Sequence, residues 1–331
     1  MTVYYDVALS FTQEYFSSRI RELCGQFDLS FFLAEPIWVY DFLKKIQEGE
    51  VRVRVLIDMG SDAFEPENLY FLLAKEVKRT GGKVINDPDY AAVAAHKGLL
   101  HGLLVQNGIP VPETVIVDRS QLDTFRLTDE IKSFVGLPFV VKPGWGGGAM
   151  GVILDGRSEE DLYRSAELAP NSDSFLIQRR LFPKTLETHV GWFRVIHIFG
   201  ETIPCWWEPP ANQYQVVTPL QERLYKLRPL GKIVKDIGRV SRTKFFSTEV
   251  ALNHDGRFLA VDYVNTGPDM HPKSFWPTGV PDEIVRHVAR SLVDHAMSII
   301  QRKRDPFAEE LEKKDLDWGE RRKRGRLVPG E

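Results

Sequence analysis

Cysteine is scarce in this 331-residue sequence, and its scarcity excludes two kinds of stabilising framework. The chain contains only Cys24 and Cys205, which are too few for a disulfide network or a structural zinc cluster. The eight histidines have no metal-ligand spacing, and we interpret them as ordinary surface or core residues. The fold must therefore rest on packed cores, and a chain of this length has room for roughly two or three domains.

The sequence also has no long apolar run and no excess of one charge. A run of about 18 apolar residues, which a transmembrane helix needs, is absent, and the N-terminal segment lacks the basic region and apolar core of a secretory signal. Lys and Arg number 43 and Asp and Glu number 46, whereas a general nucleic-acid binder has a basic excess. We therefore expect a cytoplasmic, globular protein that binds neither nucleic acid nor membrane.

Local patterns divide the chain into three blocks and a tail. Residues 1–90 are expected to form a small N-terminal α/β domain, and residues 91–175 a second block that contains a glycine-rich loop. Residues 176–300 are expected to form a third block of several strands and a terminal amphipathic helix. Residues 301–331 are charge-dense, and we interpret them as a solvated helix or tail, with a basic docking segment as the alternative.

Periodicity and turn residues predict the elements inside these blocks. Ser158 and Asp161 fit a capping box and predict the start of a helix. Turn sequences at 200–201 and 253–256 predict two β-hairpins. The other expected helices and strands are helices over 66–80, 90–106, 122–134 and 283–300, and strands over 51–57, 84–85, 111–117, 138–142 and 152–154.

A glycine-rich segment follows the expected strand that ends at Lys142. Gly146, Gly148 and Gly151 have the spacing G-x-G-x-x-G, but a dinucleotide-binding fingerprint continues into a helix, whereas residues 152–154 predict a strand. We interpret the segment as a hairpin loop whose backbone N–H groups wrap phosphate oxygens, with Lys142 reaching the same phosphate. A surface loop without a ligand and a lysine that extends into solvent are the alternatives.

Two acidic residues are expected to be neighbours across the second hairpin. Glu249 and Asp262 lie on strands that flank one turn, and carboxylates so placed repel each other unless a cation lies between them. Together with Asn265 they offer hard oxygen ligands, which suit Mg²⁺ bound with phosphates. Pairing of each carboxylate with an Arg or Lys is the alternative.

Taken together, the motifs and their order along the chain resemble those of the ATP-grasp superfamily over about residues 85–270. The matching segments are residues 94–97, 107–114, 137–152, 175–182, 193–200, 248–252 and 262–268. The resemblance implies an α/β (α+β) fold in which a small N-terminal α/β domain precedes two α+β subdomains that clasp ATP between them. In this arrangement the central subdomain carries the glycine-rich loop, and the C-terminal subdomain carries the hinge and the metal site.

The resemblance implies a role for each motif. Lys97 and Lys142 would contact the ATP phosphates, and Arg194 would stabilise the transferring phosphoryl group or the acyl phosphate. Lys142 and Arg194 would thus be the catalytic residues. The loop would close over the phosphates through Gly146, Gly147 and Gly148. The adenine and ribose would be held by Gln178, Arg179, Arg180, Leu181 and Glu187, and Mg²⁺ by Glu249, Asp262 and Asn265.

One spacing departs from the family. The family separates its last acid from the asparagine by one residue, whereas two residues separate Asp262 from Asn265. In a regular strand, alternation would put these two side chains on opposite faces. We predict a β-bulge at Tyr263 or Val264, which would return both side chains to one cleft together with the catalytic residues.

Most enzymes of this superfamily activate a carboxylate with ATP. The resemblance therefore implies an Mg²⁺- and ATP-dependent carboxylate–amine ligase with small-molecule carboxylate and amine substrates, and it is compatible with a homodimer. One alternative is an ATP-grasp kinase for a hydroxyl of a small phosphorylated substrate, which would need the basic residues Arg179, Arg180, Lys184, Arg239, Arg242 and Lys244. The other is a nucleotide-binding regulator without turnover, which the wide Asp262–Asn265 spacing favours.

Overall fold

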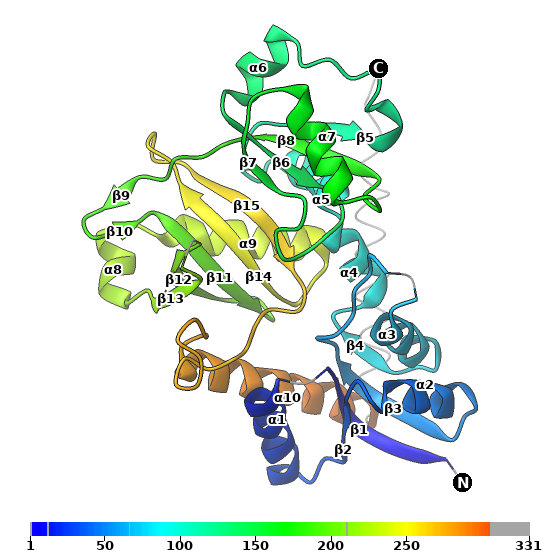
Figure 1. Ribbon diagram of the computed structural model, residues 1–331. Helices are drawn as coiled ribbons and strands as arrows, with labels where there is room; N and C mark the ends of the chain where they lie inside the picture. Colours follow the sequence, from blue (N-terminus) through cyan, green and yellow to red (C-terminus); the bar gives the residue numbers. More distant parts are fainter. Residues whose placement is uncertain (1, 12, 66, 210, 305–331) are drawn as a thin grey trace, which may run out of the picture.

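The computed structural model describes residues 2–11, 13–65, 67–209 and 211–304. These residues form three larger sheets and one two-stranded ladder, and the mixed α/β class expected from the sequence is confirmed. Figure 1 shows the N-terminal sheet at the bottom, the C-terminal sheet at the left and the central sheet at the top. From residue 305 onward, the charged tail lies outside the described residues. In the described part of the chain, no helix has both the length and the hydropathy needed to cross a membrane.

The N-terminal sheet consists of parallel strands in the order β2-β1-β3-β4. Its strands are β1 (Val3–Ser10), β2 (Phe31–Ala34), β3 (Val51–Ile57) and β4 (Lys83–Ile85). Helices α2 (Val39–Gln47) and α3 (Leu69–Arg79) cover one face, and α1 (Glu14–Gln26) and α10 (Asp282–Arg304) cover the other. The sequence-based division places the last helix in the third block, and in the structure α10 shares one core with strands of both the N-terminal and the C-terminal sheet (Figure 1).

The central sheet is antiparallel, in the order β5-β8-β6-β7. Its strands are β5 (Thr114–Asp118), β6 (Phe139–Pro143), β7 (Ile153–Gly156) and β8 (Ser174–Arg179), and its helices are α6 (Asp129–Val135) and α7 (Glu159–Leu168). The capping box predicted at Ser158 and Asp161 is present at the start of α7. The helix expected over 122–134 is shorter, because Thr128 caps α6 at its start through the Ile131 N–H.

The single helix expected over 90–106 is two helices, α4 (Pro88–Ala95) and α5 (Lys97–Gln106). His96 has an extended backbone, with φ −81° and ψ 102°, and its Nδ1 accepts the Leu99 N–H at 3.1 Å. The imidazole therefore acts as the N-cap of α5, in the way that a polar side chain satisfies an orphan amide at a helix start. This break makes Lys97 the first residue of α5.

The C-terminal sheet is antiparallel, in the order β13-β12-β11-β14-β15. Its strands are β11 (Trp192–Ile198), β12 (Glu201–Glu208), β13 (Gln213–Val216), β14 (Phe245–Leu252) and β15 (Phe258–Asn265). Both predicted hairpins, β11–β12 and β14–β15, are confirmed. Helix α9 (Arg228–Ser241) packs with α5 on one face of this sheet, and the remaining elements are α8 (Pro219–Leu224), β9 (Thr185–Leu186) and β10 (His189–Val190).

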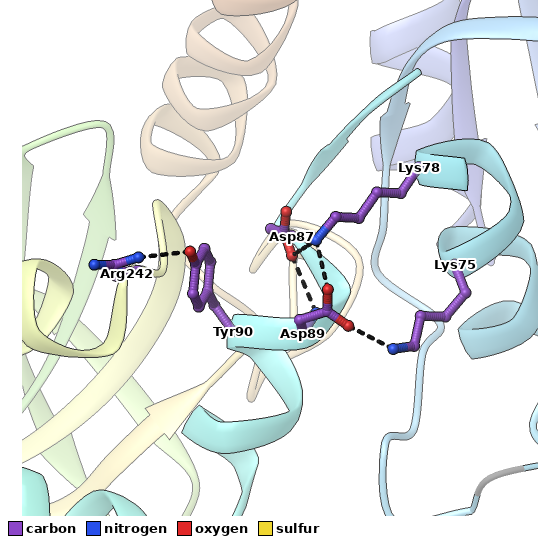
Figure 2. A network of polar contacts seen from close by, with 6 residues as sticks. All are labelled: Lys75, Lys78, Asp87, Asp89, Tyr90 and Arg242. Carbon is purple, nitrogen blue, oxygen red and sulfur yellow. Dashed lines mark hydrogen bonds and ion pairs between the residues drawn. The ribbon is translucent and has the colours of Figure 1, made fainter. Parts of the chain in front are cut away.

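Helix α4 connects the N-terminal sheet to the rest of the molecule, and polar contacts hold it on two sides (Figure 2). Lys78 of α3 donates to Asp87 at 2.7 Å and to Asp89 at 2.6 Å, and Lys75 also binds Asp89. On the other side, Arg242 at the end of α9 donates to the Tyr90 hydroxyl and lies over the Tyr90 ring at 4.9 Å. These contacts hold α4, and α4 directly precedes His96 and Lys97 in the chain.

Candidate active site

A cavity of about 770 Å³ lies where the three larger sheets approach one another. The N-terminal sheet contributes the segment after β3, and the central sheet contributes β6 and the glycine-rich loop. The C-terminal sheet contributes β11, β14 and β15. The charged residues that line the cavity are Asp58, Asp62, Lys97, Lys142, Arg194, Glu249 and Asp262. Seven ionisable groups around one cavity identify it as the candidate active site.

The two lysines reach the cavity from neighbouring elements of the central part. Lys97, at the start of α5, donates from Nζ to the Gly146 carbonyl at 2.5 Å. Lys142, near the end of β6, donates from Nζ to the Val261 carbonyl at 3.0 Å. Burial lowers the pKa of Lys142, and Lys97 lowers it further, while the carboxylates of Asp262 and Glu249 counteract both. Both ammonium groups thus occupy positions from which they can meet one anionic ligand.

The glycine-rich loop joins β6 to β7, as predicted, and does not lead into a helix. Its base is tied down, because the Gly144 N–H donates to the Ser174 carbonyl at 2.7 Å. Its tip is open: a Cβ at Gly147 or at Gly148 would meet no heavy atom within 4 Å, and Gly148 has a φ of +59°. The Trp145 ring lies 4.7 Å from the His96 ring and 6.0 Å from the Phe64 ring, measured between centroids. The loop therefore touches the N-terminal part of the molecule from across the cavity.

Arg194 and Glu249 are opposite each other on β11 and β14. The Arg194 Nη1 lies 3.6 Å from Glu249 Oε1, and the guanidinium lies 4.7 Å from the centre of the Trp207 ring. The Arg194 Nε is buried and has no hydrogen-bond partner among the described residues. An orphaned buried donor beside a cavity marks a position where a ligand acceptor would be stabilised.

The two predicted metal-binding carboxylates are also opposite each other, because Glu249 pairs with Asp262 across β14 and β15. Burial raises the pKa of Glu249, and repulsion by Asp262 adds to the effect, while Arg194, the Trp192 indole and Lys142 oppose it. The Trp192 Nε1–H donates to Glu249 Oε2 at 2.9 Å. The donor set, two carboxylates and the Asn265 amide, fits a hard cation that would relieve this repulsion.

The bulge predicted at Tyr263 or Val264 is confirmed. Ser247 pairs with Asn265 and Glu249 pairs with Asp262, so one residue of β14 lies opposite two residues of β15. Asp262 and Asn265 consequently both line the cavity, despite their wide spacing. Within the described ranges, no group of three or more His, Cys, Asp or Glu side chains is arranged to hold a metal ion. A cation here would therefore need ligand oxygens in addition to those of the protein.

The residues predicted for adenine and ribose do not line this cavity: Gln178, Arg179, Arg180, Leu181 and Glu187. Arg179 forms an ion pair with Glu113, and Arg180 forms one with Asp155. Gln178 is buried, and its amide group donates hydrogen bonds inside the protein. Leu181 packs in a small apolar cluster on β14 and β15, next to the strands that carry the carboxylates. Their assignment to the nucleoside stays a prediction.

The sequence analysis missed the contribution of the N-terminal part to the cavity. Asp58, Phe64 and Phe71 line it, as does Asn86 after β4. The available signal was positional, because ligands of parallel α/β sheets bind beyond the carboxyl ends of the strands, and Asp58 directly follows β3. Trp207 on β12 lines the same cavity.

No protein-family model and no curated protein matches this chain. Solved structures do match it over most of their lengths. D-alanine–D-alanine ligase from Bacillus anthracis, complexed with ATP, has a TM-score of 0.62 and 12% identity, covering 92% of this chain and 100% of its own. The ATP-grasp ligase PsnB, complexed with the precursor peptide PsnA2 and AMPPNP, has a TM-score of 0.58 and 12% identity. The match covers 89% of this chain and 99% of PsnB. A RimK domain protein from Sphaerobacter thermophilus has a TM-score of 0.60 and 16% identity, and the match covers 86% of this chain and 96% of that protein.

Proposed function

The chain has the ATP-grasp fold, and from this premise we propose that it is a ligase that uses ATP and Mg²⁺ to join a carboxylate to an amine. One observation carries the proposal: Lys97, Lys142 and Arg194 line the same cavity as the Glu249–Asp262 pair, beneath the glycine-rich loop. Three cations suit a polyphosphate, and two facing carboxylates suit the cation that accompanies it. Two of the solved neighbours, D-alanine–D-alanine ligase and PsnB, are described as complexes with ATP and with AMPPNP.

In the proposed mechanism, the chain's residues position ATP and stabilise charge. Lys97 and Lys142 would hold the phosphates, and the backbone N–H groups of Gly146–Gly148 would close over them and exclude water. The unpaired Nε of Arg194 would donate to the γ-phosphoryl group as it moves from ATP to the substrate carboxylate, which leaves ADP and an acyl phosphate. Mg²⁺ held by Glu249, Asp262 and Asn265 would neutralise charge on the phosphates. The amine would then attack the acyl phosphate and release inorganic phosphate.

The lining of the cavity favours this ligase over the kinase alternative. The basic residues that a phosphorylated substrate would need all lie outside the cavity lining: Arg179, Arg180, Lys184, Arg239, Arg242 and Lys244. Four of them contact other groups, namely Glu113, Asp155, Asp236 and Tyr90. On its N-terminal side the cavity has acidic and aromatic residues, which favour an uncharged or cationic acceptor over a phosphorylated one.

Nucleotide binding is tested first. ATP with Mg²⁺ should raise the melting temperature of the full chain, because a ligand that binds only the folded state stabilises it by about 2.7 kcal/mol at 100 times its Kd. Lys142→Ala should remove most of this gain, since it deletes a cavity-lining ammonium. Lys232→Ala, at an exposed position on α9, is the matched control and should keep it. No stabilisation of the wild type at millimolar ATP would refute the proposal.

Turnover is tested by ADP release from the full chain, with pooled carboxylic acids and pooled amines. The ligase proposal expects ADP release that requires one member of each pool. ADP release with a hydroxyl-bearing acceptor and no amine would support the kinase. Binding of ATP without ADP release in any combination would support the regulator, although the bulge removes the spacing argument that favoured it.

A further inference from the structure

A buried tyrosine hydroxyl connects the two halves of the proposed ATP site. Tyr263 lies at the bulge of β15, between Asp262 and Asn265, and is 2% exposed. Its hydroxyl lies 2.7 Å from Nδ1 of His101 on α5 and 2.9 Å from Nε2 of Gln178 on β8. One side chain of the C-terminal sheet is thus hydrogen-bonded to β8 of the central sheet and to α5, the helix that begins with Lys97.

The partners fix the direction of these hydrogen bonds. The Gln178 amide N–H donates to the Tyr263 oxygen. Burial lowers the pKa of His101 to about 4, with a further contribution from Lys142, so the imidazole is neutral at pH 7. A neutral ring can accept at Nδ1, and the phenol O–H is the available donor. The hydroxyl therefore uses both its donor and its acceptor capacity inside the protein.

The same two elements carry or support the lysines. Lys97 is the first residue of α5, four residues before His101. Strand β8 pairs along its length with β6, where Leu176 is opposite Lys142. On the other side of the hydroxyl, the bulge interrupts the regular ladder next to the proposed metal ligands. A bulge leaves the local backbone less constrained by strand pairing, so side-chain contacts must fix its orientation.

We propose that Tyr263 is a positioning residue, whose hydroxyl holds the Asp262–Asn265 segment at a fixed place relative to Lys97 and Lys142. This role rests on the proposed function, because it concerns the alignment of Mg²⁺ ligands with phosphate ligands. Tyr263 itself points into the core formed with α9 and α5, so it does not touch the nucleotide. The residue therefore affects how strongly bound Mg²⁺ tightens the binding of ATP.

The test measures how strongly Mg²⁺ tightens ATP binding. Isothermal titration of ATP into the full chain, in Mg²⁺ and in EDTA, gives the ratio of the two Kd values for each variant. We expect Tyr263→Phe to lower this ratio about tenfold, since it removes a buried hydrogen bond that orients the ligands and keeps the ring. The Kd in EDTA should change much less, because the lysines remain in place.

Matched variants separate positioning from general stability. Tyr163→Phe removes another tyrosine hydroxyl that forms a hydrogen bond, to the Leu122 carbonyl at 3.0 Å and outside the cavity lining, and should leave the ratio unchanged. His101→Leu should lower the ratio, whereas His101→Asn should retain most of it, because the amide oxygen can accept at the position of Nδ1. Hydrogen exchange of the nucleotide-free protein should be faster over residues 261–265 in Tyr263→Phe than in the wild type.

An unchanged ratio in Tyr263→Phe would overturn this role while leaving the proposed function intact. An equal decrease in Tyr163→Phe would also overturn it, because loss of stability alone would then explain the effect. Failure of the wild type to bind ATP in either condition would refute the proposed function, and the positioning role with it.

Discussion

Replacing Glu249 by glutamine should stabilise the nucleotide-free protein and weaken its binding of ATP with Mg²⁺. The Glu249 side chain is 16% exposed and lies opposite the Asp262 carboxylate. Its raised pKa reflects burial and this repulsion. Glutamine removes the charge, while its amide oxygen can still accept from the Trp192 indole and its amide N–H can donate toward Asp262.

The expected gain follows from what the substitution removes. The lost attractions are those to Arg194, whose contact at 3.6 Å is longer than a hydrogen bond, and to the Lys142 ammonium. The lost repulsion is between two largely buried carboxylates, and relief of such a charge conflict is worth about 1 kcal/mol. In a protein of this size that corresponds to a rise of about 2 °C in melting temperature. The gain belongs to the metal-free state only, because Mg²⁺ would use the same charge.

Differential scanning calorimetry provides the assay. Wild type, Glu249→Gln and the exposed control Glu167→Gln would be unfolded in EDTA and again with ATP and Mg²⁺. We expect Glu249→Gln to melt above the wild type in EDTA and below it with ATP and Mg²⁺, and Glu167→Gln to follow the wild type in both. A lower melting temperature in EDTA, or an unreduced gain from ATP and Mg²⁺, would refute the reasoning.

Three further predictions concern other parts of the molecule. Asn86→Ala should destabilise the protein by about 2–4 kcal/mol in chemical denaturation, because the Asn86 side chain accepts from the Lys244 and Phe245 N–H groups and donates to the Phe245 carbonyl. The control Asn107→Ala, at an exposed position, should reduce the free energy of unfolding far less. Binding of ATP with Mg²⁺ should change the fluorescence of Trp145, because this residue lines the cavity and its ring lies near those of His96 and Phe64. If a Trp145→Phe variant kept the full spectral change, this prediction would be contradicted. Burial lowers the pKa of His197 to about 4, so between pH 6.5 and 4 the unfolded state binds this proton more readily than the folded state, and this residue should lower stability by up to about 3 kcal/mol as the pH falls. His101 and His295 have similarly lowered pKa values and add to the fall. His197→Gln should remove the share of His197, and an equally steep fall would contradict the assignment.

Much of the fold could be predicted from local patterns, because its hairpins and caps are local. The turns at 200–201 and 253–256 gave the correct strand pairs, and the capping box at Ser158 gave the correct helix start. The break at His96 was not predicted, because a histidine ring rarely caps a helix and the flanking residues are good helix formers. The position of α10 depends in part on contacts with β1 and β3 of the N-terminal sheet, which lie far earlier in the chain, and no local pattern encodes such contacts.

In the candidate site, too, some features could be predicted from the sequence and others depend on distant segments. The carboxylates, the lysines and the bulge followed from motifs and from the alternation of a strand, and the structure brings these residues to one cavity. The assignment of Arg179 and Arg180 to the nucleoside rests on their place in a motif and stays a prediction, and their ion pairs with Glu113 and Asp155 join segments that no local pattern connects. The hydrogen bonds of Tyr263 depend on three elements at once, so the sequence predicted a bulge at this residue but no role for its hydroxyl.

The packing of α10 on the N-terminal sheet has a consequence for biosynthesis. Val7 and Leu9 of β1 share a core with Val285, Val288 and Leu292 of α10. A ribosome makes β1 first and α10 last among the described elements, so this face of β1 has α1 but not α10 to cover it during most of translation. The nascent chain must therefore keep this surface from aggregating, and a ribosome that stalls before residue 282 would leave it exposed for a chaperone to bind.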